Sequence, residues 1–281
     1  MARGAAAVLL AAALLQAKEP NLHSIAADLE TPKMADGEPA VGKRVKQVLS
    51  GFEGTQVYHV LYLPTDWERG KKYPVLVEYA GNGGYTNALG DVSEGTPEGS
   101  NLGYGASGGR GFLWLCLPYV DAAGKKNALN WWGDADATAD YCRKAVREVC
   151  AKHGADPERV VLTGFSRGAI ACNYIGLRDD ETAKLWRAFI AHSHYDGVRR
   201  WGYAGDDPES ARKRLERLKG RPQWVSHERS VEETRKHLES TGVKGDFTFV
   251  PLPHPNHTDA WVLRELPERR RLREWLARIL R

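Results

Sequence analysis

A serine between two glycines is the residue with the clearest chemical potential in this sequence. Residues 164–168 read Gly-Phe-Ser-Arg-Gly, a G-x-S-x-G motif centred on Ser166. A mostly apolar, β-branched run at residues 160–163 precedes the motif, and helix-forming residues follow it. This context predicts a sharp turn from a strand into a helix, where flanking glycines allow close backbone packing. The motif therefore predicts that the Ser166 hydroxyl is held above the sheet and can act as a nucleophile.

Attack on a carbonyl group creates an oxyanion, which needs hydrogen-bond donors nearby. The amide of Arg167 would stand at the start of the predicted helix and point toward that oxygen. A second donor is expected just after the predicted strand at residues 74–79, where glycines let bare N–H groups reach a ligand. An amide within residues 82–84 is expected to serve, with Asn82 and Gly83 as the leading candidates. The Arg167 side chain could also pair with a substrate carboxylate, although a solvent-facing or ion-paired arginine is the ordinary alternative.

The serine also needs a base, which must come from another loop at the same edge of the sheet. Among the nine histidines, His257 is best placed, because it follows the last predicted strand at residues 247–250 and precedes the last predicted helix. His254 is the competitor, but it lies between two prolines and closer to the strand end. We therefore predict His257 as the general base. His192, His194 and His227, at the ends of predicted strands, could line the same cleft.

Several aromatic residues fall on loops that are expected to lie near the cleft. Trp131, Trp132 and Tyr104 are the candidates for substrate binding. Together with Trp201 and Tyr203 they could form a platform for a sugar or phenolic substrate. Ordinary burial of large aromatic side chains is the alternative interpretation.

Strand-like and helix-like runs alternate along the chain, which is typical of an α/β fold with a mostly parallel, doubly wound sheet and helices on both faces. The first two strands are predicted to pair antiparallel. The segment at residues 81–110 is rich in Gly, Ser, Thr and Asn, so a long loop is expected there. The expected strands are 44–49, 56–63, 74–79, 111–117, 160–163, 188–191, 223–226 and 247–250, and helices are expected at 135–153, after Ser166, at 208–218, at 231–239 and at the C-terminal end.

The N-terminus has the pattern of a secretory signal peptide. One arginine is followed by an apolar, alanine-rich run and then by small residues, which predicts a leader over residues 1–17. Roughly 260 residues then remain, enough for one large domain over residues 18–281. No later stretch is long and apolar enough to cross a membrane. The expected location of the mature protein is therefore secreted or periplasmic.

Composition argues against several other classes of function. The 40 basic and 36 acidic residues leave a net charge of +4, and basic residues are interspersed with acids, so no nucleic-acid partner is predicted. Four cysteines do not make a disulfide scaffold in a chain of this length, and buried thiols are at least as expected as a bridge. No C-x-x-C pair or histidine cluster is present, so neither a metal nor a cofactor is predicted. Nothing in the sequence indicates an oligomeric state.

The chain resembles secreted α/β hydrolases of the esterase and polyhydroxyalkanoate-depolymerase-like group, which are close to the catalytic domains of prolyl-oligopeptidase-type peptidases. The resemblance begins near Gln56. It is carried by Tyr-His-Val-Leu-Tyr-Leu-Pro at 58–64 and Lys-Tyr-Pro-Val-Leu-Val at 72–77, by Asp-Pro-Glu-Arg-Val at 156–160 leading into the serine motif, and by His-Thr-Asp-Ala-Trp at 257–261. The resemblance implies an α/β-hydrolase fold, with Ser166 as nucleophile, His257 as base and the Arg167 amide as an oxyanion donor.

The third member of the expected triad is where this sequence departs from the family. Such hydrolases usually carry H-G-x-x-D after the corresponding strand, but here the aspartate position is Ser230. A neutral hydroxyl cannot stabilise an imidazolium as a carboxylate does. Asp196, after the preceding strand, and Glu228, on the usual loop, are the two candidates. Of these, Asp196 is preferred, although a turn residue before a glycine is also an ordinary role for it.

These residues predict a serine hydrolase that cleaves carboxylic esters of small-molecule or oligomeric substrates through an acyl-enzyme. Two alternatives remain. One is a prolyl-oligopeptidase-type serine peptidase, although the chain lacks a propeller-sized region before the hydrolase-like part. The other is a catalytically inactive binding protein on the same fold, which the missing aspartate makes worth testing.

Overall fold

The computed structural model describes residues 20–281. The predicted leader at residues 1–17 lies outside the described residues. No helix within residues 20–281 combines the length and apolar character that a membrane crossing needs.

A mixed, mostly parallel sheet is the centre of the described chain. Its nine strands within residues 20–281 run in the order β1-β2-β3-β7-β4-β8-β9-β10-β11. β2 pairs antiparallel with β3, and β3 pairs antiparallel with β7, whereas the strands from β7 to β11 are parallel. The strands are β1 (Met34–Ala35), β2 (Arg44–Gln47), β3 (His59–Tyr62), β4 (Tyr73–Tyr79), β7 (Leu113–Leu117), β8 (Ala155–Phe165), β9 (Ala188–His192), β10 (Pro222–Glu228) and β11 (Asp246–Leu252).

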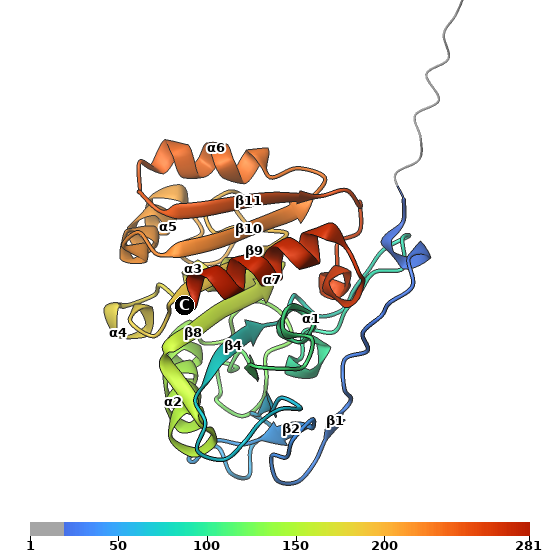
Figure 1. Cartoon of the computed structure of the whole chain (residues 1–281). Coiled ribbons are helices and arrows are strands. Elements are labelled where there is room, and N and C mark those ends of the chain that lie inside the picture. Colours follow the sequence, from blue (N-terminus) through green and yellow to red (C-terminus); the bar gives the residue numbers. More distant parts are fainter. Residues whose placement is uncertain (1–19) are drawn as a thin grey trace, which may run out of the picture.

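Helices cover both faces of this sheet (Figure 1). One apolar core lies between the sheet and the helices α2, α3, α5 and α6. A second core lies on the opposite face, under α1, the short helix η4 (Asp259–Leu263) and α7. The helices are α1 (Leu102–Ser107), α2 (Ala135–His153), α3 (Arg167–Tyr174), α4 (Asp180–Ala183), α5 (Pro208–Leu215), α6 (Glu232–Thr241) and α7 (Pro267–Ile279), with short 3₁₀ turns η1 (Leu22–Ser24), η2 (Pro97–Gly99) and η3 (Glu216–Leu218). The predicted α/β class and the antiparallel leading pair are confirmed.

The segment at residues 81–110, predicted as a loop, contains a two-stranded hairpin of β5 (Tyr85–Thr86) and β6 (Val92–Ser93), η2 and α1. The prediction missed α1 because two glycines interrupt its apolar pattern. Tertiary contacts stabilise this helix. The buried Glu78 carboxylate accepts hydrogen bonds from the first amides of α1 at 2.8–3.0 Å, and Gly103 allows the helix to pack where a Cβ would meet Trp114 at 2.2 Å.

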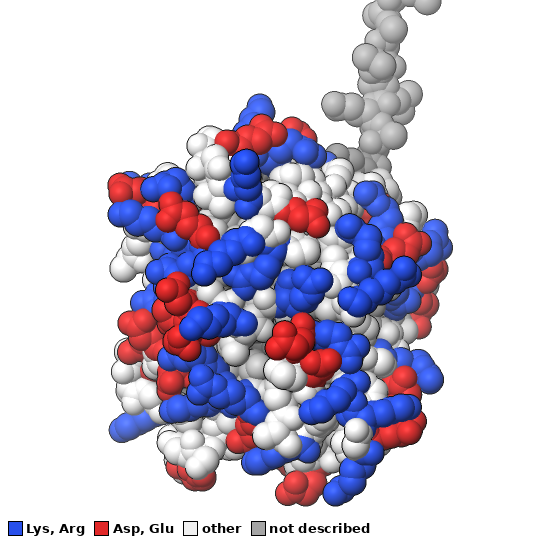
Figure 2. Space-filling view, turned by 60° about the vertical axis from the view of Figure 1, so that its left-hand side comes forward, with Lys and Arg blue, Asp and Glu red and all other residues white. Residues whose placement is uncertain are grey.

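On the face in Figure 2, acidic side chains lie among the basic ones. The four cysteines all fall within the described chain and are free thiols. Cys116, Cys142 and Cys172 are buried, and burial raises the pKa of the Cys116 and Cys142 thiols to about 12.

Candidate active site

Ser166 lies at the junction between β8 and α3, in a backbone conformation that few non-glycine residues adopt. Its φ is 53° and its ψ is −114°. The flanking glycines make this turn possible, because a Cβ at Gly164 would lie 2.1 Å from the Gly168 carbonyl oxygen, and a Cβ at Gly168 would lie 1.9 Å from that of Tyr79. The Ser166 amide donates to the His192 carbonyl at 2.9 Å. The chain thus holds a strained serine at the carboxyl edge of the parallel strands.

His257 reaches this serine from the loop that follows β11. Its Nε2 atom lies 3.1 Å from the Ser166 Oγ atom. The rings of Phe165, Tyr85 and His194 surround it at centroid distances of 4.8, 5.0 and 5.1 Å. The competing candidate, His254, is buried elsewhere and its Nδ1 lies 2.9 Å from the Pro20 carbonyl.

Glu228, the last residue of β10, approaches the other side of the His257 ring. Its Oε1 atom lies 2.9 Å from His257 Nδ1. Since an ionised carboxylate can only accept, Nδ1 carries the proton and the Nε2 lone pair faces Ser166. Burial alone would raise the pKa of the Glu228 carboxyl, but the hydrogen bond to His257 and the neighbouring imidazoles hold that pKa below its usual range.

The preference for Asp196 beside the histidine is wrong. The Asp196 carboxylate accepts two hydrogen bonds from the Arg214 guanidinium on α5, at 2.8 and 2.9 Å, and a longer one of 3.3 Å from the Tyr203 hydroxyl. Gly197, at φ 83°, turns the chain here, and the carboxylate is directed toward α5. Of the two carboxylates predicted for this role, only Glu228 has a contact with His257 in the described chain.

Ser193 is a buried residue that the sequence analysis did not identify. Its hydroxyl donates to both Glu228 oxygens, at 2.6 and 2.8 Å, and accepts from His257 Nδ1 at 2.7 Å. Its φ of 88° is in the left-handed region, and its amide donates to the Ser226 carbonyl at 2.8 Å. Ser193 therefore orients both the carboxylate and the imidazole. The only sequence signal was its place two residues after the predicted strand at 188–191.

The candidate oxyanion donors are in different situations. Arg167 begins α3, so its amide has no intrahelical acceptor, and Arg167 and Asn82 line one cavity with Ser166. The prediction that the Gly83 amide is an oxyanion donor is wrong. This amide donates to the Leu129 carbonyl at 2.8 Å and cannot serve a substrate at the same time.

The Arg167 side chain is buried and does not face a substrate carboxylate. Its Nη atoms donate to the carbonyls of Trp131 at 2.7 Å and Gly81 at 2.8 Å, with longer contacts to Gly95 and Ala128. The guanidinium carbon lies 3.8 Å from the centroid of the Tyr119 ring. Burial lowers the pKa of Arg167 to about 10, which leaves it charged at neutral pH. Arg167 therefore holds together two loops that wall the Ser166 cavity.

The cavity at Ser166 has a volume of about 220 Å³. Trp131 and Trp201 line it together with His194, whereas Trp132 is buried and lines a neighbouring groove. The prediction that Tyr104 lies at the substrate-binding site is also wrong. Tyr104 lies on α1, packed against Tyr62 and Trp114 at centroid distances of 5.6 and 6.1 Å, because α1 docks on the other face of the sheet.

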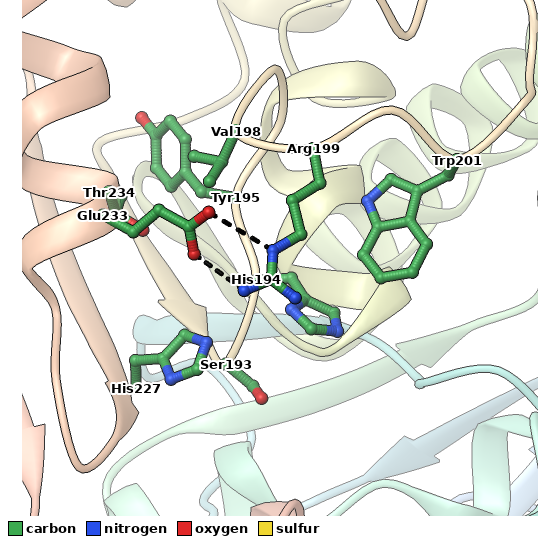
Figure 3. Close-up of a pocket in the computed structure, with 9 residues that line it drawn as sticks. All are labelled: Ser193, His194, Tyr195, Val198, Arg199, Trp201, His227, Glu233 and Thr234. Carbon is green, nitrogen blue, oxygen red and sulfur yellow. Dashed lines mark hydrogen bonds and ion pairs between the residues drawn. The ribbon is translucent and has the colours of Figure 1, made fainter.

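A small polar cavity adjoins this one (Figure 3). His227 and Ser193 line it, and so do Arg199 and Glu233, which form an ion pair of 2.8 Å. The neighbouring His194 lines both cavities. Burial lowers the pKa of His194 to about 3, so this ring is neutral. His192 is fully buried, with its ring nitrogens near Ser226 Oγ and the Thr258 carbonyl. No group of three or more potential ligand side chains within residues 20–281 is arranged to hold a metal ion.

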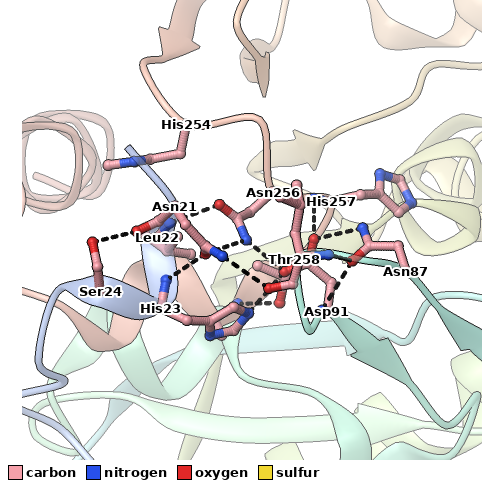
Figure 4. A network of polar contacts seen from close by, with 12 residues as sticks. Asn21, Leu22, His23, Ser24, Asn87, Asp91, His254, Asn256, His257 and Thr258 are labelled. Atoms are coloured by element: carbon pink, nitrogen blue, oxygen red, sulfur yellow. Dashed lines mark hydrogen bonds and ion pairs between the residues drawn. The ribbon is translucent and has the colours of Figure 1, made fainter. Parts of the chain in front are cut away.

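Asp91 fixes the loop that carries His257 (Figure 4). Its buried carboxylate accepts hydrogen bonds of 2.8 Å from the His257 amide, from the side-chain amides of Asn256 and Asn87, and from His23. The N-terminal part of the described chain joins this network, since the Leu22 amide donates to Asn256 Oδ1 at 2.7 Å. Segments far apart in sequence thus meet behind the imidazole, which no local pattern could predict.

No family model matches the chain, and no curated protein matches its sequence. A thermostable esterase gives a TM-score of 0.52 at 20% identity, over 84% of this chain and 62% of that one. An esterase from Rhizomucor miehei gives 0.57 at 14% identity, over 84% and 82%. The isopeptidase AtxE2 gives 0.55 at 16% identity, over 85% and 40%.

These similarities, together with the sheet order, establish the class of fold: the chain has the α/β-hydrolase fold. The chain spans only part of the length of two of these proteins, 62% of the thermostable esterase and 40% of the isopeptidase.

Proposed function

We propose that this protein is a serine hydrolase that cleaves carboxylic esters through an acyl-enzyme on Ser166, with His257 as general base and Glu228 as the acid of the triad. The observation that carries the proposal is the continuous hydrogen-bonded chain from Ser166 Oγ through the His257 ring to Glu228, with distances of 3.1 and 2.9 Å. Serine, imidazole and carboxylate in this order are the arrangement that activates a hydroxyl nucleophile.

In the proposed reaction His257 Nε2 takes the Ser166 proton while Oγ forms a bond to the ester carbonyl carbon. The amides of Arg167 and Asn82 bind the resulting oxyanion. His257 then gives the proton to the leaving alcohol, and the carbon–oxygen bond of the ester breaks. In the second half of the cycle, His257 takes a proton from a water molecule while the water oxygen attacks the acyl carbon. The bond to Ser166 Oγ then breaks, His257 returns the proton to Oγ, and the carboxylic acid is released. Glu228 stabilises the imidazolium that forms twice in each cycle.

The cavity at Ser166 favours esters over peptides as substrates. It is small and mostly lined by rings, which suits a compact acyl group more than a peptide backbone with many polar groups to satisfy. The isopeptidase neighbour keeps amide cleavage as the second candidate.

The test uses the purified full chain with short-chain p-nitrophenyl esters beside peptide p-nitroanilides. We expect hydrolysis of the esters and little of the anilides, and loss of at least about a thousandfold in kcat in Ser166→Ala. Faster hydrolysis of anilides would favour the peptidase alternative. Ester hydrolysis that survives in Ser166→Ala would contradict the proposal.

A further inference from the structure

Trp131 lies between two cavities. The first is the cavity of about 220 Å³ at Ser166, and the second is an outer groove of about 410 Å³ that is lined by Trp132, Tyr174 and Tyr203. Trp131 and Trp201 line both, and their ring centroids are 5.9 Å apart. These two rings therefore form a shared wall.

The backbone of Trp131 is held in an unusual conformation by residues of the site itself. Its φ is 50°, a region that bulky side chains rarely adopt. Its amide donates to Asn82 Oδ1 at 2.9 Å, and its carbonyl accepts from Arg167 Nη1 at 2.7 Å. Both partners also line the Ser166 cavity. Backbone strain that is held by site residues is typical of functional positions.

The place of Trp131 relative to His257 indicates which part of an ester it meets. The leaving alcohol must lie near His257 Nε2, because it receives the proton from that atom. Tyr85, Phe165 and His194 surround the His257 ring, whereas the ring of Trp131 packs on Trp132, Trp201 and Tyr203. Trp201 joins the two groups, because its ring centroid also lies 5.1 Å from that of His194.

The acyl side of the ester, away from His257, is the side expected to meet Trp131, which is hydrogen-bonded to Asn82 and Arg167, the two proposed oxyanion donors.

We propose that Trp131 is a specificity-determining residue that closes the acyl end of the Ser166 cavity and limits the length of the acyl chain, an inference that rests on the proposed ester hydrolysis. Without this ring, the cavity and the outer groove would become one continuous space lined by Trp201, Trp132 and Tyr203. Each additional methylene buried there would raise kcat/KM by about fourfold.

The experiment measures kcat/KM for p-nitrophenyl acetate, butyrate, hexanoate, octanoate and decanoate with the full chain. We expect wild type to prefer the short acyl groups. In Trp131→Ala the ratio of decanoate to butyrate should rise by at least about tenfold. Trp131→Phe, which retains a ring, is the matched control and should keep a profile close to that of wild type.

Two further variants separate the wall from a folding defect. Trp131→Gly removes the ring and accepts a positive φ without strain. Trp201→Ala opens the same wall from the opposite side. Both should shift the ratio in the same direction as Trp131→Ala. The inference is overturned if these variants hydrolyse the butyrate ester at the wild-type rate and keep the wild-type preference for acyl length. It is also overturned if the variants change the preference only among esters that differ in the leaving alcohol.

A binding measurement tests the proposed role of Trp131 independently of the proposed catalytic activity. Butyrate and decanoate resemble the acid product, so calorimetric titration with each reports the depth of the cavity without any turnover. Trp131→Gly should bind decanoate at least about tenfold more tightly than wild type does. If wild type cleaves no ester but this shift in binding occurs, the hydrolase proposal fails and the proposed role of Trp131 is supported. If the relative affinity for decanoate and butyrate is unchanged in Trp131→Gly, the proposed role of Trp131 is overturned, even when the protein is an active hydrolase.

Discussion

Two buried carboxylates follow neighbouring parallel strands, and their partners set them apart. Glu228 ends β10 and lies 2.9 Å from His257 Nδ1. Asp196 follows the end of β9 and accepts two hydrogen bonds from Arg214. Both are placed near the carboxyl edge of the sheet, where α/β proteins gather their functional groups.

The difference lies in what the partner can do with a proton. An imidazole gains and loses a proton near neutral pH, whereas a guanidinium stays charged. Glu228 can therefore stabilise a charge that appears and disappears during a reaction. Asp196 instead forms a permanent ion pair that fixes the loop after β9 to α5. Position at a strand end is thus insufficient to identify the acid of a triad, and the partner decides.

The largest expected effect comes from Glu228→Gln, which keeps the size of the side chain and removes its charge. We expect kcat for a short ester to fall by about 10²–10⁴-fold, because the imidazolium loses its carboxylate. Asp196→Asn is the matched control and should keep kcat within about threefold. Steady-state kinetics at neutral pH measure both. A larger loss in Asp196→Asn than in Glu228→Gln would reverse the comparison.

The same pair should separate in the opposite sense for stability. Asp196→Ala leaves the nearly buried Arg214 without its carboxylate and should lower the free energy of unfolding by about 3–5 kcal/mol. Chemical denaturation of this variant beside Glu228→Gln measures the contrast. Equal losses in the two variants would indicate that Glu228 is mainly structural.

Ser193 gives an intermediate prediction. Ser193→Ala removes the hydroxyl that donates to both Glu228 oxygens, so kcat should fall about tenfold while KM stays nearly constant. Ser193→Gly should give the same loss and also relieve the positive φ.

Ser226→Ala, a buried serine beside His192, is the control for a general packing defect and should leave kcat near wild type. A change of KM alone in the Ser193 variants would argue against a positioning role.

The smallest expected effect is on the pH dependence of stability. The pKa of Glu228 in the folded chain lies below its ordinary value of 4.5. Its ionisation therefore stabilises the folded state above about pH 4.5, and this contribution is lost as the pH falls through the folded pKa. The difference in Tm between wild type and Glu228→Gln should shrink as the pH is lowered from 7 to 3. A constant difference would contradict the sign of this pKa shift.

The strand ends were predictable because apolar runs and glycines mark them, and they placed Ser166 and His257 at one edge of the sheet. The choice between Asp196 and Glu228 as the partner of His257 was not predictable from the sequence, because it depends on the direction of a side chain after a turn. Arg214 comes from a helix further along the chain, and nothing near Asp196 in the sequence reveals the ion pair.

Other errors have similar causes. The Gly83 amide is taken by the Leu129 carbonyl from a distant loop, so a glycine-rich pattern alone could not show whether that amide is free. Tyr104 lies on the opposite face of the sheet because α1 depends on Glu78 and on close packing at glycines. Local propensity is silent about such contacts.

The most direct test of the central claim is the rate at which a fluorophosphonate modifies Ser166 at neutral pH, followed by peptide mass spectrometry. In the proposed mechanism, attack by Ser166 Oγ requires the imidazole of His257 and the charge of Glu228. Wild type and Asp196→Asn should therefore be labelled at similar rates, Glu228→Gln at least about a hundredfold more slowly, and His257→Ala hardly at all. No adduct on Ser166 in wild type, or equal labelling in His257→Ala, would contradict the account.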